Sequence, residues 1–150
     1  SRRRHTRYGT VTGVQTCALP ISVEQHGPCS YERSLQEMRA ADVLLLVENP
    51  QAKSSVYLPS KLIDYLWAGR PLLALTPFDG TVSDVLGPEY PLRSDPGDVE
   101  QTAHCFELCL AEGSTARLQA ANEILALARG EFDAHRVTAH LVDQLREIAP

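Results

Sequence analysis

The chain has 150 residues, 43% of them hydrophobic, which is enough for one domain with a buried core. Its 14 Lys and Arg residues face 19 Asp and Glu residues, and the net charge of −5 argues against a nucleic-acid partner held by overall positive charge. The apolar run at 43–47 has the length of a strand and falls far short of the roughly 20 residues that a membrane span needs. The cysteines are expected to stay reduced, which indicates a cytoplasmic setting.

The beginning of the chain is set apart from the rest. Residues 11–21, VTGVQTCALPI, resemble the translation of an adapter used in sequencing libraries. We expect residues 1–22 to be a non-native segment and leave them out of the fold prediction. A signal peptide and a basic arm that binds nucleic acid are the alternatives, and Gln15, Thr16 and Pro20 interrupt the apolar stretch that a signal peptide needs. On the adapter interpretation, the natural protein extends upstream and residues 23–150 are its C-terminal part.

The next two segments predict a helix followed by a strand. Apolar residues recur at helical spacing across residues 30–42, at Tyr31, Leu35 and Met38. Residues 42–48, DVLLLVE, then give an unbroken apolar run, which is typical of a strand buried on both faces of a sheet.

A second helix and a second strand follow a polar loop. Pro59 is suited to the start of a helix, and Gly69 to its end in a left-handed conformation. The apolar face expected for this helix consists of Leu62, Ile63, Leu66 and Trp67. Residues 71–77, PLLALTP, predict a second buried strand.

The C-terminal half is predicted to be mainly helical. We expect a short helix in 78–86, a brief edge strand at 90–93, and three longer helices in 95–113, 114–130 and 133–148. The apolar residues expected to face inward are Val99, Ala103, Phe106 and Leu110 in the first long helix, and the second has Leu118, Ile124, Leu125 and Ala128. In the third, one apolar stripe is formed by Val137, Leu141, Leu145 and Ile148. Apolar strands alternating with helices predict an α/β fold with a Rossmann-like parallel sheet flanked by helices.

The start of the helix at Pro59 is the candidate binding site. A helix N-terminus carries partial positive charge and free N–H groups, so phosphate is its natural ligand, and Ser60 and Lys61 add a hydroxyl and an ammonium. Asp64, one turn further on, could accept hydrogen bonds from a vicinal diol such as ribose. The ordinary alternative is a helix opening without a ligand, with Lys61 solvated and Asp64 paired with Arg70. No glycine-rich dinucleotide or P-loop motif is present.

The sequence predicts no metal site and leaves the catalytic residues unassigned. Cys105 and Cys109 lie four residues apart beside His104 and would supply at most three zinc ligands. Cysteines at this helical spacing are more often small core residues. No serine–histidine–acid or cysteine–histidine set can be assembled.

Several segments resemble the C-terminal half of a GT-B fold glycosyltransferase of the family 4-like (group 1) type. They are SLQEMRAADVLLLVENP, VYLPSKLIDYLWAGRPLLALTP and GTVSDVL. The similarity runs from about Val23 to about Pro77 and is weaker beyond. It implies that residues 23–150 are a partial nucleotide-sugar-binding domain, the partial C-terminal domain of a GT-B fold.

The resemblance also implies roles for single residues. Backbone N–H groups near Ser60 and Lys61 would hold the diphosphate of a nucleotide-sugar donor, and Asp64 would contact the ribose. The family marks its site with two acidic residues separated by seven others, and the first of these falls at Val56. The contact to the transferred sugar, and with it the identity of the donor, therefore stays open.

The remaining implications concern the site's surroundings and the whole enzyme. His26 and Gly27 would lie at a strand tip that faces the site, although a lone histidine there is more often a turn residue. The last helix, 133–148, would cross back to a missing N-terminal acceptor domain, or else close on its own sheet.

The function expected from the resemblance is transfer of a sugar to a glycan or a lipid-linked acceptor, without a cofactor. The full enzyme could associate peripherally with a membrane, and this fragment is expected to be inactive alone. The alternatives are a nucleotide-sugar epimerase of the same fold and a non-catalytic α/β module.

Overall fold

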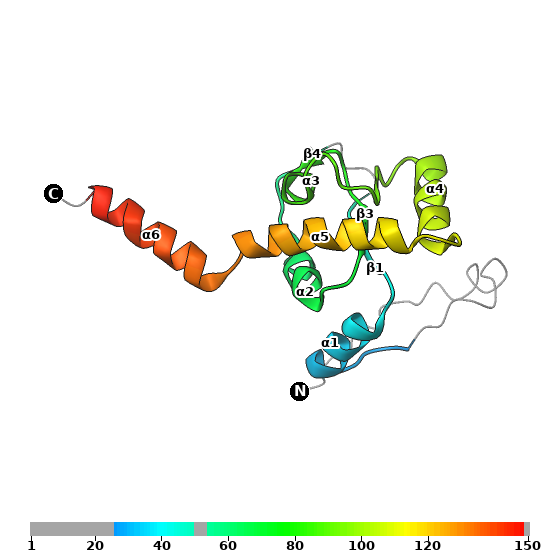
Figure 1. The fold of residues 1–150 in the computed structure, drawn as a ribbon, viewed down its shortest axis with the longest axis horizontal. Coiled ribbons are helices and arrows are strands. Elements are labelled where there is room, and N and C mark those ends of the chain that lie inside the picture. The colour runs from blue at the N-terminus through cyan, green and yellow to red at the C-terminus, as the bar shows by residue number, and fades with distance from the viewer. Residues whose placement is uncertain (1–25, 50–53, 149–150) are drawn as a thin grey trace, which may run out of the picture. The chain divides into compact units, whose positions relative to one another are not determined.

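The computed structural model describes residues 26–49 and 54–148 (Figure 1). The chain divides into two compact units, residues 1–30 and residues 31–150. The described part of the first unit, residues 26–30, contains no helix or strand. All the helices and strands described below belong to the second unit.

The second unit alternates helices and strands. Its elements are α1 (Tyr31–Ala40), β1 (Leu44–Val47), β2 (Ser54–Ser55), α2 (Ser60–Ala68), β3 (Leu72–Leu75), β4 (Asp79–Gly80), α3 (Thr81–Leu86), β5 (Arg93–Ser94), α4 (Val99–Leu110), α5 (Thr115–Glu131) and α6 (Ala134–Ile148). The predicted α/β class is confirmed, as are the predicted helices and the strands β1, β3 and β5. The two-residue strands β2 and β4 were not predicted.

All strand pairs are parallel. The main sheet has the order β1-β3-β5, and its register pairs Leu44 with Leu72 and Val47 with Leu75. β2 and β4 form a separate two-stranded sheet beyond the carboxyl ends of β1 and β3. Every residue of the central strand β3 is buried, as predicted. Parallel strands joined through helices place their carboxyl ends at one edge, where the candidate site lies.

The prediction that β1 is buried on both faces is wrong. Leu44 and Leu46 are buried, but Leu45 is 44% exposed and Val47 is 56% exposed. The physical reason is the position of β1, which is an edge strand of the described sheet. The described elements cover the face that carries Leu45 and Val47 only in part.

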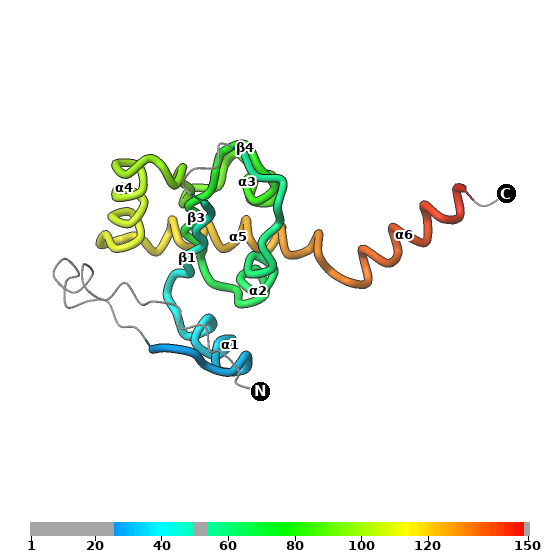
Figure 2. The backbone as a smooth tube through the Cα atoms, turned by 180° about the vertical axis from the view of Figure 1, so that it is seen from behind, coloured from blue at the N-terminus to red at the C-terminus, as the bar shows by residue number. Residues whose placement is uncertain are grey.

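The core lies between the sheet and the helices α2, α3 and α5. Leu62 and Leu66 of α2 are fully buried, and Ala121 and Leu125 of α5 join the same cluster. Figure 1 and the opposite view in Figure 2 show α5 passing close to α2 and α3. The inward side chains predicted for α5 are confirmed as buried or half-buried: Leu118, Ile124, Leu125 and Ala128.

The inward face predicted for α4 is wrong. Its four expected inward residues are all exposed: Val99, Ala103, Phe106 and Leu110. The helix meets β5 through smaller side chains instead. The Ser94 and Thr102 hydroxyls share a hydrogen bond of 3.0 Å, and the buried Cys105 thiol donates to the Arg93 carbonyl at 3.6 Å. Cys105 is thus a small core residue, as expected.

Helix α6 has an apolar stripe without a covering partner among the described residues. None of its side chains is buried, and the residues of the predicted stripe are exposed: Val137, Leu141, Leu145 and Ile148. The alternative in which α6 closes on its own sheet is therefore not observed. Among the described residues, no helix combines the length and the apolar character that crossing a membrane requires.

Candidate functional site

The carboxyl ends of β1 and β3 are tied together by one carboxylate. Glu48 follows β1, and its side chain accepts hydrogen bonds from the Ser55 hydroxyl, at 2.9 Å, and from the buried Thr76 hydroxyl. Thr76 follows β3, so the half-buried Glu48 links both strand ends to the loop before α2. This arrangement fixes one wall of the candidate site.

A close backbone contact holds the same loop from the other side. Gly80 pairs with Ser55 between β4 and β2, and a Cβ atom at Gly80 would lie 2.7 Å from the Ser55 carbonyl oxygen. The Thr81 hydroxyl also donates to that oxygen at 3.3 Å. Only glycine allows this approach, so the position of the loop before α2 depends on Gly80.

The N-terminus of α2 is open in the way that the sequence predicts. Pro59 is the N-cap residue and provides no side-chain cap, and its carbonyl accepts the Leu62 N–H at 2.9 Å. No acceptor among the described residues meets the N–H groups of Ser60 and Lys61. At the other end Gly69, with φ of 69°, ends the helix in the predicted left-handed conformation.

This open end faces a hollow of about 450 Å³ at the carboxyl end of β1. Its lining consists of Leu46, Val47, Glu48, Asn49, Ser55, Tyr57, Pro59, Ser60 and Lys61. A volume of this size falls within the usual range for small-molecule sites. Lys61 is the cation of this lining, and no described carboxylate lies within ion-pair distance of it. The structure therefore brings together Pro59, Ser60 and Lys61, three of the predicted site residues.

Asp64 lies elsewhere. Its carboxylate accepts a hydrogen bond from the Tyr31 hydroxyl of α1 at 3.0 Å, and it lines a second, smaller hollow of about 180 Å³. This hydrogen bond is the main cause of the raised pKa of Tyr31. Asp64 does not line the hollow at the tip of α2, so the expected one-turn arrangement with Ser60 inside one hollow is not observed.

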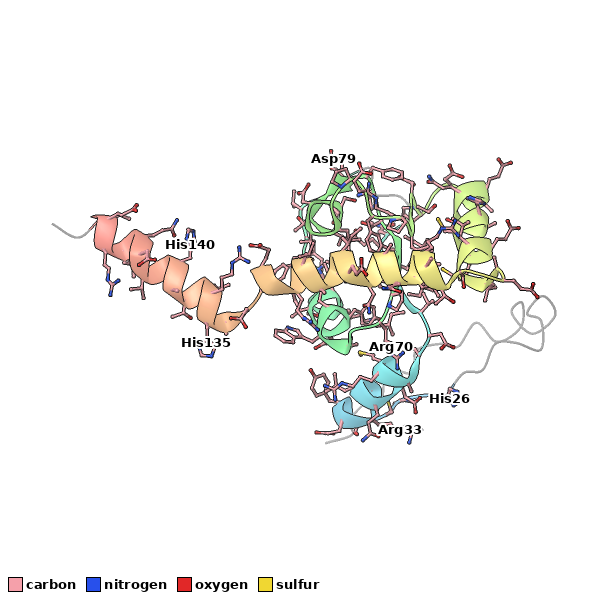
Figure 3. All side chains as sticks on the ribbon, viewed as in Figure 1. His26, Arg33, Arg70, Asp79, His135 and His140 are labelled. Atoms are coloured by element: carbon pink, nitrogen blue, oxygen red, sulfur yellow. The ribbon has the colours of Figure 1, made fainter. Side chains whose placement is uncertain are left out.

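The alternative ion pair between Asp64 and Arg70 is not observed either. The Arg70 Nε donates to the Arg39 carbonyl at 2.7 Å, and Figure 3 labels Arg70 near α1. The Arg70 side chain therefore joins the turn after α2 to the end of α1 through a hydrogen bond to a backbone carbonyl.

His26 and Gly27 belong to the first unit. Both residues are exposed, and Gly27 adopts a φ of 70°, which suits a glycine in a turn. Their predicted place at a strand tip beside the site stays a prediction.

Sequence reasoning missed two contacts in this region. The position of Thr76 directly after an apolar strand places it at this edge of the sheet, but no sequence signal pairs its buried hydroxyl with Glu48. Tyr31 and Asp64 are 33 residues apart in the sequence, so no local sequence pattern predicts their hydrogen bond. Within the described residues, no group of three or more His, Cys, Asp or Glu side chains is arranged to bind a metal ion.

Comparisons with protein-family models and with curated protein sequences gave no match. The site geometry and the sequence resemblance therefore carry the functional argument.

Proposed function

We propose that this chain is the donor-binding part of a glycosyltransferase and that the tip of α2 holds the diphosphate of a nucleotide sugar. One observation carries the proposal. Two N–H groups that meet no acceptor among the described residues lie with the Ser60 hydroxyl and the Lys61 ammonium at a hollow beside the carboxyl ends of parallel strands. Open parallel sheets bind their ligands at this edge.

The chemistry of this tip suits a diphosphate. The N-terminus of a helix favours negative charge, and its free N–H groups donate directly to phosphate oxygens. Charge-assisted hydrogen bonds of this kind contribute about 1.5–3 kcal/mol each. In sugar transfer the nucleoside diphosphate leaves, and the same donors would stabilise the charge that develops on it.

The lining offers a second type of contact. The Tyr57 ring is 67% exposed and lies beside Pro59 in the same hollow. An exposed aromatic face can stack against the ring of a sugar or a base. Glu48 is already engaged by two hydroxyls, so its role in the proposal is to position the loop, and no proton transfer is assigned to it.

The proposal does not depend on Asp64. A ribose contact by Asp64 would require a ligand that reaches from the tip of α2 to the hollow beside Tyr31. The proposed diphosphate contact at Ser60 and Lys61 does not require the ligand to extend to the hollow beside Tyr31. The sugar, the base and the acceptor are left open, with a glycan or lipid-linked acceptor and a cytoplasmic location as parts of the proposal.

Two alternatives are separated by experiment. A nucleotide-sugar epimerase would bind the same ligands, whereas a non-catalytic α/β module would bind none. Calorimetric titration with UDP, GDP and ADP, on protein with its upstream coding sequence restored, is expected to show saturable binding of at least one nucleotide. Absence of binding by all three in folded protein would favour the module.

Activity separates the two enzymes. The glycosyltransferase proposal expects transfer of sugar to an acceptor by the longer protein and none by residues 23–150 alone. Release of an epimerised nucleotide sugar without transfer would identify the epimerase.

A further inference from the structure

The Arg93 guanidinium has no anionic partner among the described residues. Its Nε atom is buried and meets no hydrogen-bond acceptor in the described part of the chain. No described carboxylate lies within ion-pair distance of it. Burial also lowers the pKa of Arg93, because the fold removes water from the cation. A charge that is withdrawn from water is costly unless it is paired, so a bound anion would stabilise this side chain.

The position of this guanidinium is fixed by its neighbours. It stacks on the Phe78 ring, with 4.7 Å between the Arg93 Cζ atom and the ring centroid. The Cys105 thiol donates to the Arg93 carbonyl at 3.6 Å and holds the strand on one side. On the other side, the Ser83 hydroxyl donates at 2.6 Å to the carbonyl of Pro77, the residue before Phe78. The planar donor group is therefore preorganised, which lowers the entropy cost of binding a ligand.

The same guanidinium lines a hollow of about 300 Å³ beside α3. The lining consists of Phe78, Ser83, Asp84, Gly87, Pro88 and Arg93. None of these residues lines the hollow at the tip of α2, so the two hollows are separate. Because the Arg93 Nε atom is enclosed, the terminal nitrogens are the part of the guanidinium that a ligand in this hollow can meet.

The chemistry of the lining favours a carboxylate over a phosphate. Two further donors are already used, because the Ser83 hydroxyl donates to Pro77 and the Gly87 N–H donates to the Ser83 carbonyl at 2.9 Å. Pro88 has no N–H group. One guanidinium matches the two oxygens of a carboxylate, whereas a phosphate brings a third oxygen and nearly a second negative charge. The hollow therefore suits a ligand with a single carboxylate.

Asp84 sets a second condition on the ligand. Its exposed side chain lines the same hollow and lies outside ion-pair distance of Arg93. A carboxylate accepts hydrogen bonds and repels anions. A ligand with two negative charges is therefore disfavoured. A ligand that carries a hydrogen-bond donor beside its carboxylate can contact both Arg93 and Asp84.

We propose that the hollow lined by Arg93 and Asp84 binds a small carboxylate whose neighbouring carbon bears a hydroxyl or an amino group. The terminal nitrogens of Arg93 donate to the carboxylate of the ligand, and Asp84 accepts from its hydroxyl or amino group. α-Hydroxy acids and α-amino acids share this chemistry. The site does not rest on the proposed function, because it uses none of the residues at the tip of α2.

NMR titration of the 150-residue chain tests the site. The Nε–H signal of Arg93 reports on the guanidinium itself, and lactate differs from propionate only by its α-hydroxyl group. Lactate is expected to give saturable shifts of this signal and of the Phe78 amide. Propionate is expected to bind about tenfold more weakly, because it lacks one hydrogen bond to a charged group. Alanine, titrated in parallel, distinguishes an amino acid from a hydroxy acid as the better ligand.

Three outcomes would overturn the proposal. The first is an unchanged Arg93 signal with both lactate and alanine throughout the millimolar range. The second is tighter binding of inorganic phosphate than of either acid. The third is equal affinity for lactate, alanine and propionate, which would mean that Asp84 makes no contact to the ligand.

Matched variants separate the two contacts. Arg93→Lys keeps the charge but loses the planar donor group, and is expected to raise the Kd for lactate about tenfold or more. Arg129→Lys is the control, because Arg129 also stacks on an aromatic ring, that of Trp67 at 5.6 Å, but lies outside this hollow. Asp84→Ala is expected to bring lactate and propionate to equal affinity, a ratio that does not depend on a change in stability. An unchanged lactate Kd in Arg93→Lys, or an equal rise in Arg129→Lys, would contradict the site.

Discussion

The Tyr31 hydroxyl donates a hydrogen bond of 3.0 Å to the Asp64 carboxylate and thereby joins α1 to α2. The contact gives Asp64 a defined partner on the side of α2 that faces α1. Ser60 and Lys61 instead line the hollow at the tip of the same helix. Asp64 and the N-terminal residues of α2 therefore line separate hollows.

Replacing Asp64 should change the titration of Tyr31. The hydrogen bond and the negative charge of Asp64 raise the pKa of the Tyr31 hydroxyl, because both favour its neutral form. Asp64→Asn is expected to lower that pKa towards the usual value, measured by tyrosinate absorbance during alkaline titration. Tyr31→Phe identifies the Tyr31 contribution to the signal.

The sign of the associated stability change follows from the same shift. A tyrosine pKa that is higher in the folded state gives a stabilising contribution below the pKa of the unfolded chain, and this contribution is lost as the pH rises through the folded value. Unfolding free energies of the parent protein and Asp64→Asn should therefore converge at alkaline pH. An unchanged Tyr31 titration in Asp64→Asn would show that the contact is not formed in solution.

Tyr90 is expected to be important for stability. Its buried hydroxyl donates to the Leu72 carbonyl at 2.6 Å and accepts the Leu72 N–H at 3.1 Å. Tyr90→Phe leaves this backbone pair unsatisfied beside β3, which costs about 1–3 kcal/mol in the free energy of unfolding. Urea denaturation measures the loss. Tyr57→Phe, at an exposed ring, is the control and should change stability little.

Two glycine substitutions should have opposite effects. Gly80→Ala places a methyl group against the Ser55 carbonyl and is expected to lower the unfolding midpoint by separating β2 from β4. Gly130 lies in α5, where an added Cβ meets nothing closer than 3.8 Å. Gly130→Ala should therefore stabilise the protein by up to about 1 kcal/mol through helix propensity. Equal thermal midpoints for both variants would mean that the close approach at Gly80 does not exist.

Removing the Lys61 ammonium should weaken nucleotide binding. Loss of one charge-assisted contact of about 1.4 kcal/mol corresponds to a tenfold higher Kd. Lys61→Ala is expected to raise the Kd for the bound nucleotide by about that factor with an unchanged thermal midpoint. Arg146→Ala, at an exposed cation of α6, is the control and should bind like the parent. A clearly lower thermal midpoint of Lys61→Ala with an unaltered Kd would give Lys61 a structural role.

Much of this fold could be predicted from local sequence signals, because those signals depend only on residues that are close together in the chain. Pro59 and Gly69 set the two ends of α2, and the apolar run of β3 matches its complete burial. β2 and β4 could not be predicted, because these two-residue strands form only when the folded chain brings Ser55 beside Gly80.

The errors share a physical cause. Apolar side chains of β1 and α4 have the pattern of buried residues, but burial requires a neighbour that the described chain does not supply. The contact at Asp64 was missed for a similar reason, since its direction is set by Tyr31 of another helix. Sequence pattern indicates which surfaces need a partner without indicating whether the partner is present.

Backbone amide shifts during nucleotide titration test the central claim most directly. The measurement follows Ser60 and Lys61 in the protein with its upstream sequence restored while UDP, GDP or ADP is added. The account predicts saturable shifts at both amides with at least one nucleotide, and smaller shifts in Lys61→Ala. Unchanged Ser60 and Lys61 amides with all three nucleotides, in protein whose other amides show a folded sheet, would contradict it.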